Sequence, residues 1–131
     1  MYDNALICYT SDHGDMPGDH HHWRKTYAYE GSSHIPYIVK WPSCIANKID
    51  ESKKRVEQPV ELRDFLPTFL DVAGGEIPED MDGKSLLGLV SHEECAWREF
   101  IDLEHATCYS SDNYWSALTD GKIKYIWFFR T

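Results

Sequence analysis

The chain has 131 residues, a length suited to one domain, and its 42% hydrophobic and 14% aromatic content is typical of a globular protein. Its 13 basic and 22 acidic side chains give a formal charge of −9, which argues against nucleic-acid binding because no basic field displaces phosphate counterions. The apolar runs are too short to span a bilayer and no signal peptide opens the chain, so we expect no membrane segment, and the localisation stays open.

Two strands and a long loop are predicted in the first part of the chain. An unbroken apolar run at residues 5–9 predicts a strand buried on both faces, as in a parallel sheet. Residues 14–35 carry no periodic signal, and a loop of that length in a compact domain is usually functional or disordered. A second strand is predicted at residues 36–41, and the polar residues 43–57 indicate a solvated loop.

The best helix signal lies at residues 62–73, where apolar side chains recur at helical spacing before Gly74-Gly75 ends the pattern. Pro67 leaves two alternatives. Either Asp64 is the N-cap and Pro67 lies in the first turn, or a longer helix kinks at Pro67. A short helical turn is predicted at residues 85–90.

Antiparallel strands are predicted after residue 95. Residues 100–104 indicate one strand, and residues 115–119 and 123–129 indicate a hairpin whose Asp120-Gly121 pair suits a type I′ turn. Both chain ends have the character of interrupted apolar strands. We therefore expect a piece of a larger protein, with exposed strands through which two copies could associate.

The four cysteines are far apart and form no C-x-x-C pair, which disfavours a structural zinc site. Cys8 is most simply a small buried hydrophobic residue. The sequence leaves open whether Cys44, Cys95 and Cys108 are free or paired.

Polar side chains with metal-binding capacity follow the first predicted strand. Asp12 and His13 lie where ligands bind in open α/β sheets, beyond the carboxyl end of a strand. They could reach one metal ion, or they could be a loop-capping carboxylate and a solvated imidazole, and spacing alone favours neither. Lys25 could neutralise an anionic ester oxygen beside a metal, or it could be an ordinary exposed lysine.

Further histidines border the same region. His34 could donate a hydrogen bond to an anion or leaving group, although composition alone favours a polar residue that ends the loop. The run at residues 20–22 could bind a transition metal, but one histidine facing a site, with the others in solvent, is the simpler interpretation.

Longer motifs resemble the second half of the type I sulfatases, which are members of the alkaline phosphatase superfamily. The resemblance extends in order and spacing over almost the whole chain, through T-S-D-H-G at 10–14, G-D-H at 18–20, W-x-K at 23–25, Y-E-G-S-S-H-I-P at 29–36, E-L-R-D-F-L-P-T-F-L-D-V-A-G at 61–74, D-G-K-S-L at 82–86 and L-T-D-G-K-x-K-Y-I at 118–126. It implies an α/β fold in which residues 1–95 are the C-terminal part of the sulfatase core and residues 96–131 begin a small antiparallel subdomain.

The resemblance also implies an arylsulfatase-like sulfuric ester hydrolase and assigns roles to particular residues. Asp12 and His13 match metal ligands, Lys25 matches the lysine that contacts the sulfate, and His34, with His20 beside it, is expected near the substrate. The implied cofactor is a divalent metal, usually Ca²⁺, although an imidazole ligand suits Mn²⁺ better and Mg²⁺ stays possible. The implied partner is a sulfated small molecule or glycan.

The chain departs from the family pattern in two respects. None of its cysteines begins the C/S-x-P/A-x-R motif that yields the formylglycine nucleophile, and the family's first acidic metal-ligand pair is absent. We expect both in a preceding segment and predict that this chain alone is inactive. Two alternatives stay open, namely a phosphate or phosphonate ester hydrolase of the same superfamily, and a non-catalytic domain that self-associates.

Overall fold

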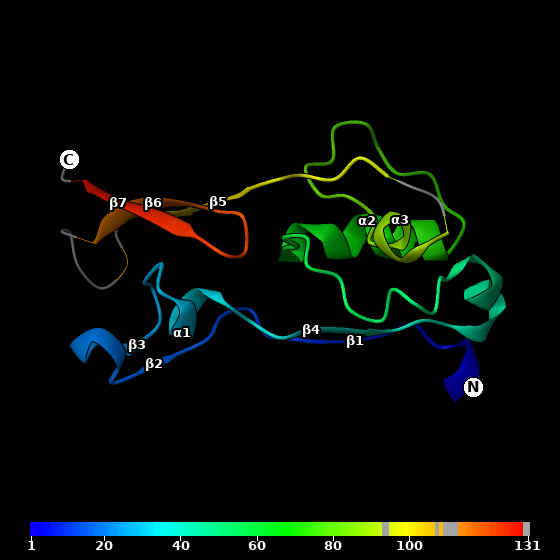
Figure 1. The fold of residues 1–131 in the computed structure, drawn as a ribbon, viewed down its shortest axis with the longest axis horizontal. Helices are drawn as coiled ribbons and strands as arrows, with labels where there is room; N and C mark the ends of the chain where they lie inside the picture. Colours follow the sequence, from blue (N-terminus) through cyan, green and yellow to red (C-terminus); the bar gives the residue numbers. More distant parts are fainter. Residues whose placement is uncertain (93–94, 107, 109–112, 130–131) are drawn as a thin grey trace. The chain divides into compact units, whose positions relative to one another are not determined.

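The computed structural model describes residues 1–92, 95–106, 108 and 113–129 of the chain. Its elements gather into two compact units, one formed by residues 1–8 and 39–99 and the other by residues 9–38 and 100–131 (Figure 1). These units are defined by contacts within the chain, so the division at residue 95 into core and subdomain stays a prediction.

Strands β1 (Ile7–Thr10) and β4 (Tyr37–Lys40) pair in a two-stranded sheet, close to the two strands that the sequence predicts. The expectation that the first strand is buried on both faces is wrong, because Ile7 is 39% and Tyr9 64% exposed. The physical reason is that each strand of this sheet has only one neighbour in the described part of the chain.

The other regular elements of the first unit are short helices. It contains η1 (Tyr2–Asn4), η3 (Ser43–Lys48), η4 (Leu62–Asp64), α2 (Phe65–Val72) and α3 (Leu87–Val90). The short helical turn expected at residues 85–90 is confirmed by α3. The expectation of a solvated loop over residues 43–57 is wrong for residues 43–48, where η3 lies.

Helix α2 confirms the first of the two alternatives for Pro67. Asp64 is the N-cap, and Pro67 is the third helical residue, where its missing N–H has no intrahelical partner to lose. Gly74, with φ of 75°, follows the helix end as expected for a left-handed stop. The apolar stripe is largely open, however, since Leu66 is 56% and Phe69 44% exposed.

A buried carboxylate fixes the start of α2. Asp64 is fully buried and accepts hydrogen bonds from the backbone N–H groups of Glu61 and Lys84, both at 2.9 Å. Arg98 adds two charge-assisted hydrogen bonds of 2.6 Å, one to each carboxylate oxygen. Each carboxylate oxygen of Asp64 therefore accepts two hydrogen bonds, which offsets the cost of burying this charge.

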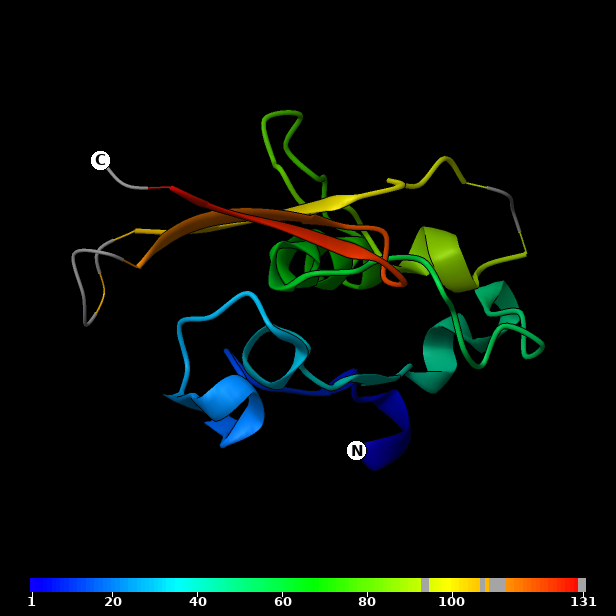
Figure 2. The same ribbon diagram turned by 60° about the vertical axis from the view of Figure 1, so that its left-hand side comes forward.

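The second unit contains a three-stranded antiparallel sheet of β5 (Ile101–His105), β6 (Tyr114–Thr119) and β7 (Lys124–Phe129), whose twist is visible in Figure 2. This confirms the predicted strand and hairpin. The turn differs from type I′, because residues 120–123 form a four-residue loop and only Gly121 has a positive φ. Asp120 Oδ1 instead accepts the N–H groups of Lys122 and Ile123, which closes the loop.

The long segment expected to lack regular structure contains short elements. It forms the hairpin of β2 (Met16–Pro17) and β3 (Trp23–Arg24), the turn η2 (Asp19–His21) and the helix α1 (Glu30–Ser33). Ala28 at its centre packs in the core of the unit with Trp115 and Ala117 of β6.

The cysteines Cys8, Cys44, Cys95 and Cys108 are all free thiols. Burial raises the pKa of Cys8, but the side chain is only half-buried, so the expectation of a buried hydrophobic residue is met in part. In the described residues, no helix is both long and apolar enough to cross a bilayer.

Candidate functional site

The loop after β1 is held in place by glycines. The N–H of Gly14 donates to the carbonyl of Ser32 at 2.8 Å. A Cβ on Gly14 would lie 2.1 Å from the Gly31 carbonyl oxygen, which is far inside van der Waals contact. Only glycine allows this approach, which anchors the Asp12-His13 loop against α1.

A hydrogen bond to the backbone carbonyl of Gly14 holds the side chain of His13. Its Nδ1 lies 2.8 Å from the carbonyl oxygen of Gly14, and because a carbonyl can only accept, Nδ1 carries the proton. The lone pair is therefore on Nε2. A backbone carbonyl that holds the distal N–H in this way is a common partner of metal-binding histidines.

Three groups that the sequence singled out lie together around that lone pair. Lys25 Nζ is 2.8 Å from His13 Nε2, and Asp12 Oδ2 is 3.6 Å from the same atom. The Asp12 side chain is 82% exposed and the His13 side chain 34% exposed, so the cluster is open to solvent. Such an arrangement can hold a cation between carboxylate and imidazole, or an anion on the ammonium.

The charges in this cluster act on Asp12. Slight desolvation raises its pKa, but His13 when it is protonated, the N–H of His13 and the Lys25 ammonium lower it by more, so the pKa lies below the ordinary aspartate value. The cluster therefore favours the carboxylate form of Asp12, the form in which it can bind a metal.

Contacts with β6 and with the residue before it hold the backbone next to Lys25. The next residue, Thr26, has a φ of 86°, which is rare for a β-branched residue. Its carbonyl oxygen accepts hydrogen bonds from Trp115 Nε1 at 2.9 Å and Asn113 Nδ2 at 3.1 Å. These two contacts hold the strained backbone at Thr26 and so fix the position of the neighbouring Lys25 backbone.

The donor set at Asp12 and His13 fits a divalent metal in part. A carboxylate oxygen and an imidazole nitrogen are both good ligands, but Ca²⁺ takes six to eight ligands and Mg²⁺ six. Among the residues that the structure describes, no group of three or more His, Cys, Asp or Glu side chains could hold a metal. Asp12 and His13 could supply two of the ligands, and the others could be backbone carbonyls, water or groups outside the described residues.

His34 belongs to a different cluster, at the end of α1. Its Nδ1 lies 2.8 Å from Glu30 Oε2, and the other oxygen of Glu30 pairs with Lys124 Nζ, which also donates to Ser33 Oγ at 2.7 Å. Burial raises the pKa of Glu30, but the hydrogen bond and charge of Lys124 and the charge of His34 lower it by more, so the net shift is downward.

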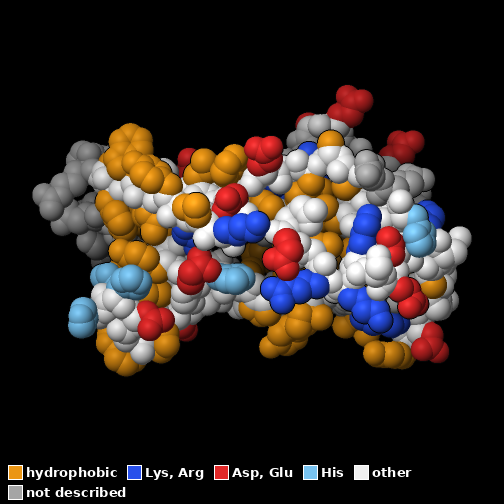
Figure 3. Space-filling view, viewed as in Figure 1, with side chains coloured by type: hydrophobic (Ala, Val, Ile, Leu, Met, Phe, Trp, Pro, Cys, Tyr) orange, Lys and Arg blue, Asp and Glu red, His pale blue; other side chains and the backbone are white. Residues whose placement is uncertain are grey.

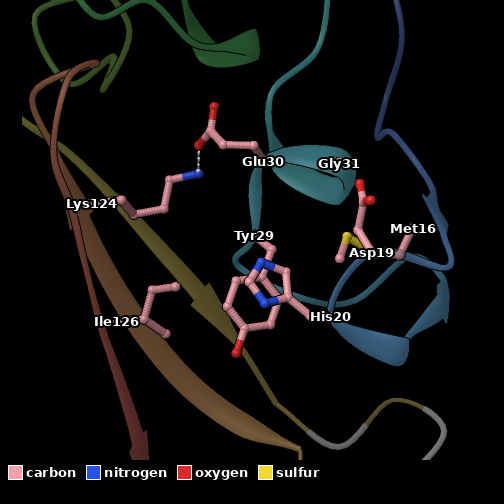
Figure 4. A pocket seen from close by; sticks show the side chains of 8 residues that line it. All are labelled: Met16, Asp19, His20, Tyr29, Glu30, Gly31, Lys124 and Ile126. Atoms are coloured by element: carbon pink, nitrogen blue, oxygen red, sulfur yellow. Dashed lines mark hydrogen bonds and ion pairs between the residues drawn. The ribbon is translucent and has the colours of Figure 1, made fainter.

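His20 lines a pocket with Tyr29 and Glu30 from the start of α1 and Lys124 from β7, as Figure 4 shows. Sequence patterns do not indicate Glu30 or Lys124 as site residues. The spacing of four between Glu30 and His34 could have indicated their pairing on one helical turn, but nothing local links Lys124 to residues 94 positions earlier.

Comparisons with known proteins identify relatives of this chain. Residues 18–129 match the family described as N-sulphoglucosamine sulphohydrolase, C-terminal. The chain is 37% identical over 126 residues to an arylsulfatase of Clostridium perfringens, covering 95% of this chain and 25% of that protein. It is 38% identical over 99 residues to arylsulfatase K of the dog Canis lupus familiaris, covering 76% of this chain and 17% of that protein.

Solved structures of similar fold also include a protein bound to a sulfated substrate. A protein solved in complex with its substrate, D-glucosamine-2-N,6-O-disulfate, matches with a TM-score of 0.72 and 29% identity, over 96% of this chain and 26% of its own. The chain thus spans about a quarter of the length of the Clostridium perfringens arylsulfatase and of this solved protein. Their similarity confirms the predicted sulfatase fold, and the chain belongs to the N-sulphoglucosamine sulphohydrolase C-terminal family of sulfatases.

Proposed function

We propose that this chain supplies part of the metal and sulfate site of an enzyme that hydrolyses sulfate esters. The observation that carries the proposal is the meeting of Asp12, His13 and Lys25, with Asp12 Oδ2 at 3.6 Å and Lys25 Nζ at 2.8 Å from one imidazole nitrogen. An anionic ester needs positive charge at its oxygens as it reacts, and this cluster has an ammonium beside two metal ligands.

Sulfatases of this kind are generally metal-dependent. We infer that Asp12 and His13 would hold a divalent cation, with Ca²⁺ the family expectation and Mn²⁺ or Mg²⁺ the alternatives. The metal would supply Lewis-acid polarisation of the sulfuryl group. The proton on His13 Nδ1, bonded to Gly14, supports this role because it leaves the lone pair on Nε2, where a metal would replace the hydrogen bond from Lys25.

The remaining roles concern the substrate. Lys25 would neutralise a nonbridging sulfate oxygen, and His34, with Nδ1 bonded to Glu30, would present Nε2 toward a leaving oxygen. His20 would contact the organic part of the substrate. The formylglycine nucleophile would come from outside these residues, so we expect no turnover of 4-nitrophenyl sulfate by this chain alone.

Binding to the 131-residue chain tests the proposal without requiring activity. Calorimetry should detect Mn²⁺ or Ca²⁺, and inorganic sulfate should bind more tightly once the cation is present. Asp12→Asn and His13→Ala should each weaken cation binding at least about tenfold, as expected for loss of a ligand. Asp15→Asn is the matched control, since Asp15 is exposed in the same loop and outside the cluster. Equal effects of the Asp12 and Asp15 variants would contradict the assignment.

A parallel titration separates the sulfate and phosphate alternatives. Sulfate should bind the cation-loaded chain at least as well as phosphate when both are compared as singly esterified anions such as methyl sulfate and methyl phosphate. A clear preference for methyl phosphate would favour the phosphate ester hydrolase instead.

A further inference from the structure

A single lone pair connects the candidate cation ligand with the candidate anion-binding residue. His13 Nδ1 carries the proton, because it faces the carbonyl oxygen of Gly14 at 2.8 Å, so Nε2 is the acceptor. Lys25 Nζ lies 2.8 Å from Nε2 and donates to it. A neutral imidazole has one such lone pair, which an ammonium and a metal ion cannot use together. Cation binding at His13 therefore requires that the Lys25 ammonium leave Nε2.

Without a cation, this cluster attracts anions weakly. Asp12 Oδ2 lies 3.6 Å and Lys25 Nζ 2.8 Å from the same imidazole nitrogen, so the carboxylate and the ammonium largely offset each other. The chain carries a formal charge of −9, and Lys and Arg side chains are interspersed with Asp and Glu on the face that Figure 3 shows. An anion at this cluster therefore depends on local positive charge that is not already paired.

The backbone around Lys25 is held in place, whereas its side chain can change partners. Arg24 and Thr26, on either side, have φ of 71° and 86°, in the left-handed region that non-glycine residues rarely adopt. The Thr26 carbonyl is held by Trp115 Nε1 at 2.9 Å and Asn113 Nδ2 at 3.1 Å. Such strain persists where the surroundings enforce it, and it gathers at switch regions. A lysine ammonium, by contrast, lies at the end of a flexible four-carbon stem.

We propose that Lys25 is a cation-operated switch for anion binding, an inference that rests on the proposed function of Asp12 and His13. In the cation-free chain, the Lys25 ammonium occupies the His13 lone pair and is withheld from anions. Cation binding at Nε2 releases the ammonium, which then becomes available to a sulfate oxygen. The released ammonium and the cation repel each other, and an anion that contacts both relieves this repulsion. Binding is therefore ordered, with the cation first and the anion second.

The main test removes the acceptor of the Lys25 hydrogen bond in the absence of any cation. The background is Asp12→Ala, because the 82% exposed Asp12 side chain would otherwise remain as a second partner for the freed ammonium. Inorganic sulfate is titrated into the 131-residue chain with EDTA present and ionic strength constant, and amide NMR follows binding. Adding His13→Phe should tighten sulfate binding by about 3- to 10-fold, as expected when one competing hydrogen bond is lost.

Two controls show whether this gain belongs to Lys25. Adding Lys25→Ala to the Asp12→Ala and His13→Phe variant should abolish the gain, because no ammonium is left to release. His21→Phe in the Asp12→Ala background is the matched control, since His21 is an exposed histidine of the same unit with no contact to the cluster among the described residues. It should leave sulfate binding unchanged.

The ammonium itself gives a direct readout in the wild-type chain. Nuclear Overhauser contacts between the Lys25 ammonium and the His13 ring should be present with EDTA and lost when Ca²⁺ or Mg²⁺, both diamagnetic, is added. Lys124 is the internal control, because its ammonium pairs with Glu30 and donates to Ser33 Oγ at 2.7 Å in the same unit. Its signal should not respond to the cation.

Failure of the switch can be told apart from failure of the proposed function. Equal sulfate affinities with and without the His13 ring, a gain that survives Lys25→Ala, or Lys25–His13 contacts that persist in the cation-loaded chain would each overturn the switch. If the wild-type chain still bound cation and sulfate at this cluster, the proposed function would stand. A wild-type chain that binds no cation at Asp12 and His13 would contradict the proposed function, and the switch with it.

Discussion

His13 makes two contacts that together determine what the candidate site can bind. The Gly14 carbonyl holds its Nδ1 proton, and its Nε2 faces both the Asp12 carboxylate and the Lys25 ammonium. A metal and Lys25 therefore compete for the same lone pair. The proximity of Lys25 helps an anion to bind, but it opposes a cation.

That competition leads to a prediction for Lys25→Ala. Removing a positive charge close to the cation should tighten Mn²⁺ binding by about fivefold, which corresponds to about 1 kcal/mol at water-like screening. The same change should weaken sulfate binding to the cation-loaded chain. Calorimetry measures both. Looser Mn²⁺ binding would contradict a shared site, and Lys48→Ala, an exposed lysine in η3, is the control.

The ion pairs of Glu30 give a pH prediction with a definite sign. Its folded-state pKa is lowered, so its pairing stabilises the fold above the unfolded pKa, and this stabilisation is lost as the pH falls through the folded pKa. The effect is small because the Glu30 side chain is 66% exposed. Lys124→Ala should move the pKa of Glu30 up toward the ordinary value, as read from carboxyl NMR shifts. Lys122→Ala should leave it unchanged, and a Glu30 pKa indifferent to Lys124 would refute this.

Arg98 has the largest predicted effect on stability. Arg98→Ala leaves the fully buried Asp64 carboxylate without its charged partner, which should lower the free energy of unfolding by about 3–5 kcal/mol. Arg63→Ala removes a pair with Glu61 in which the Arg63 side chain is 45% exposed, and Glu61 keeps its contact with Arg98, so the change should cost at most about 1 kcal/mol. Urea titrations compare the two variants. Similar costs for both would show that the buried pair does not hold the start of α2.

At the level of elements, the contact between the loop after β1 and α1 connects fold and function. Gly14→Ala places a methyl group against the Gly31 carbonyl and should cost about 1–3 kcal/mol while it weakens cation binding. Gly74→Ala is the control. It also substitutes a glycine, at a φ of 75°, but meets nothing within 4 Å, so it should cost about 1 kcal/mol and spare the cation site. Unchanged cation binding by Gly14→Ala would show that the loop does not need this anchor.

The elements that the sequence predicted correctly depend on local patterns. Helix α2 follows from its apolar spacing and the Gly74 stop, and the β6–β7 hairpin follows from two apolar runs around Asp120-Gly121. The segment at residues 14–35 was missed because its short elements depend on distant partners. Trp115 holds Thr26 across 89 positions, and no periodicity encodes such a contact.

The candidate site was predictable to a similar, limited extent. Asp12, His13 and Lys25 came from a motif at fixed spacing, and they do lie together. The Glu30–Lys124 pair and the His20–Tyr29 stack depend on tertiary packing and on a left-handed backbone at His20, which sequence patterns do not reveal. The apolar run of the first strand predicts burial on both faces, but β1 pairs with β4 alone and stays partly exposed.

At the level of the whole molecule, apolar surface on β7 is open. Tyr125 is 70% and Trp127 62% exposed on the last described strand. We propose that the chain associates through such exposed strands, and we expect light scattering to give a mass above that of the monomer at high concentration. Trp127→Lys should shift the distribution toward monomer, whereas Lys122→Glu in the adjacent turn should not. A strictly monomeric wild-type chain would count against association.

The proposed function depends most on a single ion site shared by the Asp12 carboxylate and the His13 imidazole beside Lys25. Paramagnetic Mn²⁺ added at low occupancy to the chain, followed by NMR, locates such a site directly. We predict signal broadening centred on Asp12, His13 and Lys25 that disappears in His13→Ala. Broadening centred on residues 20–22, or spread evenly over the acidic surface, would contradict the account.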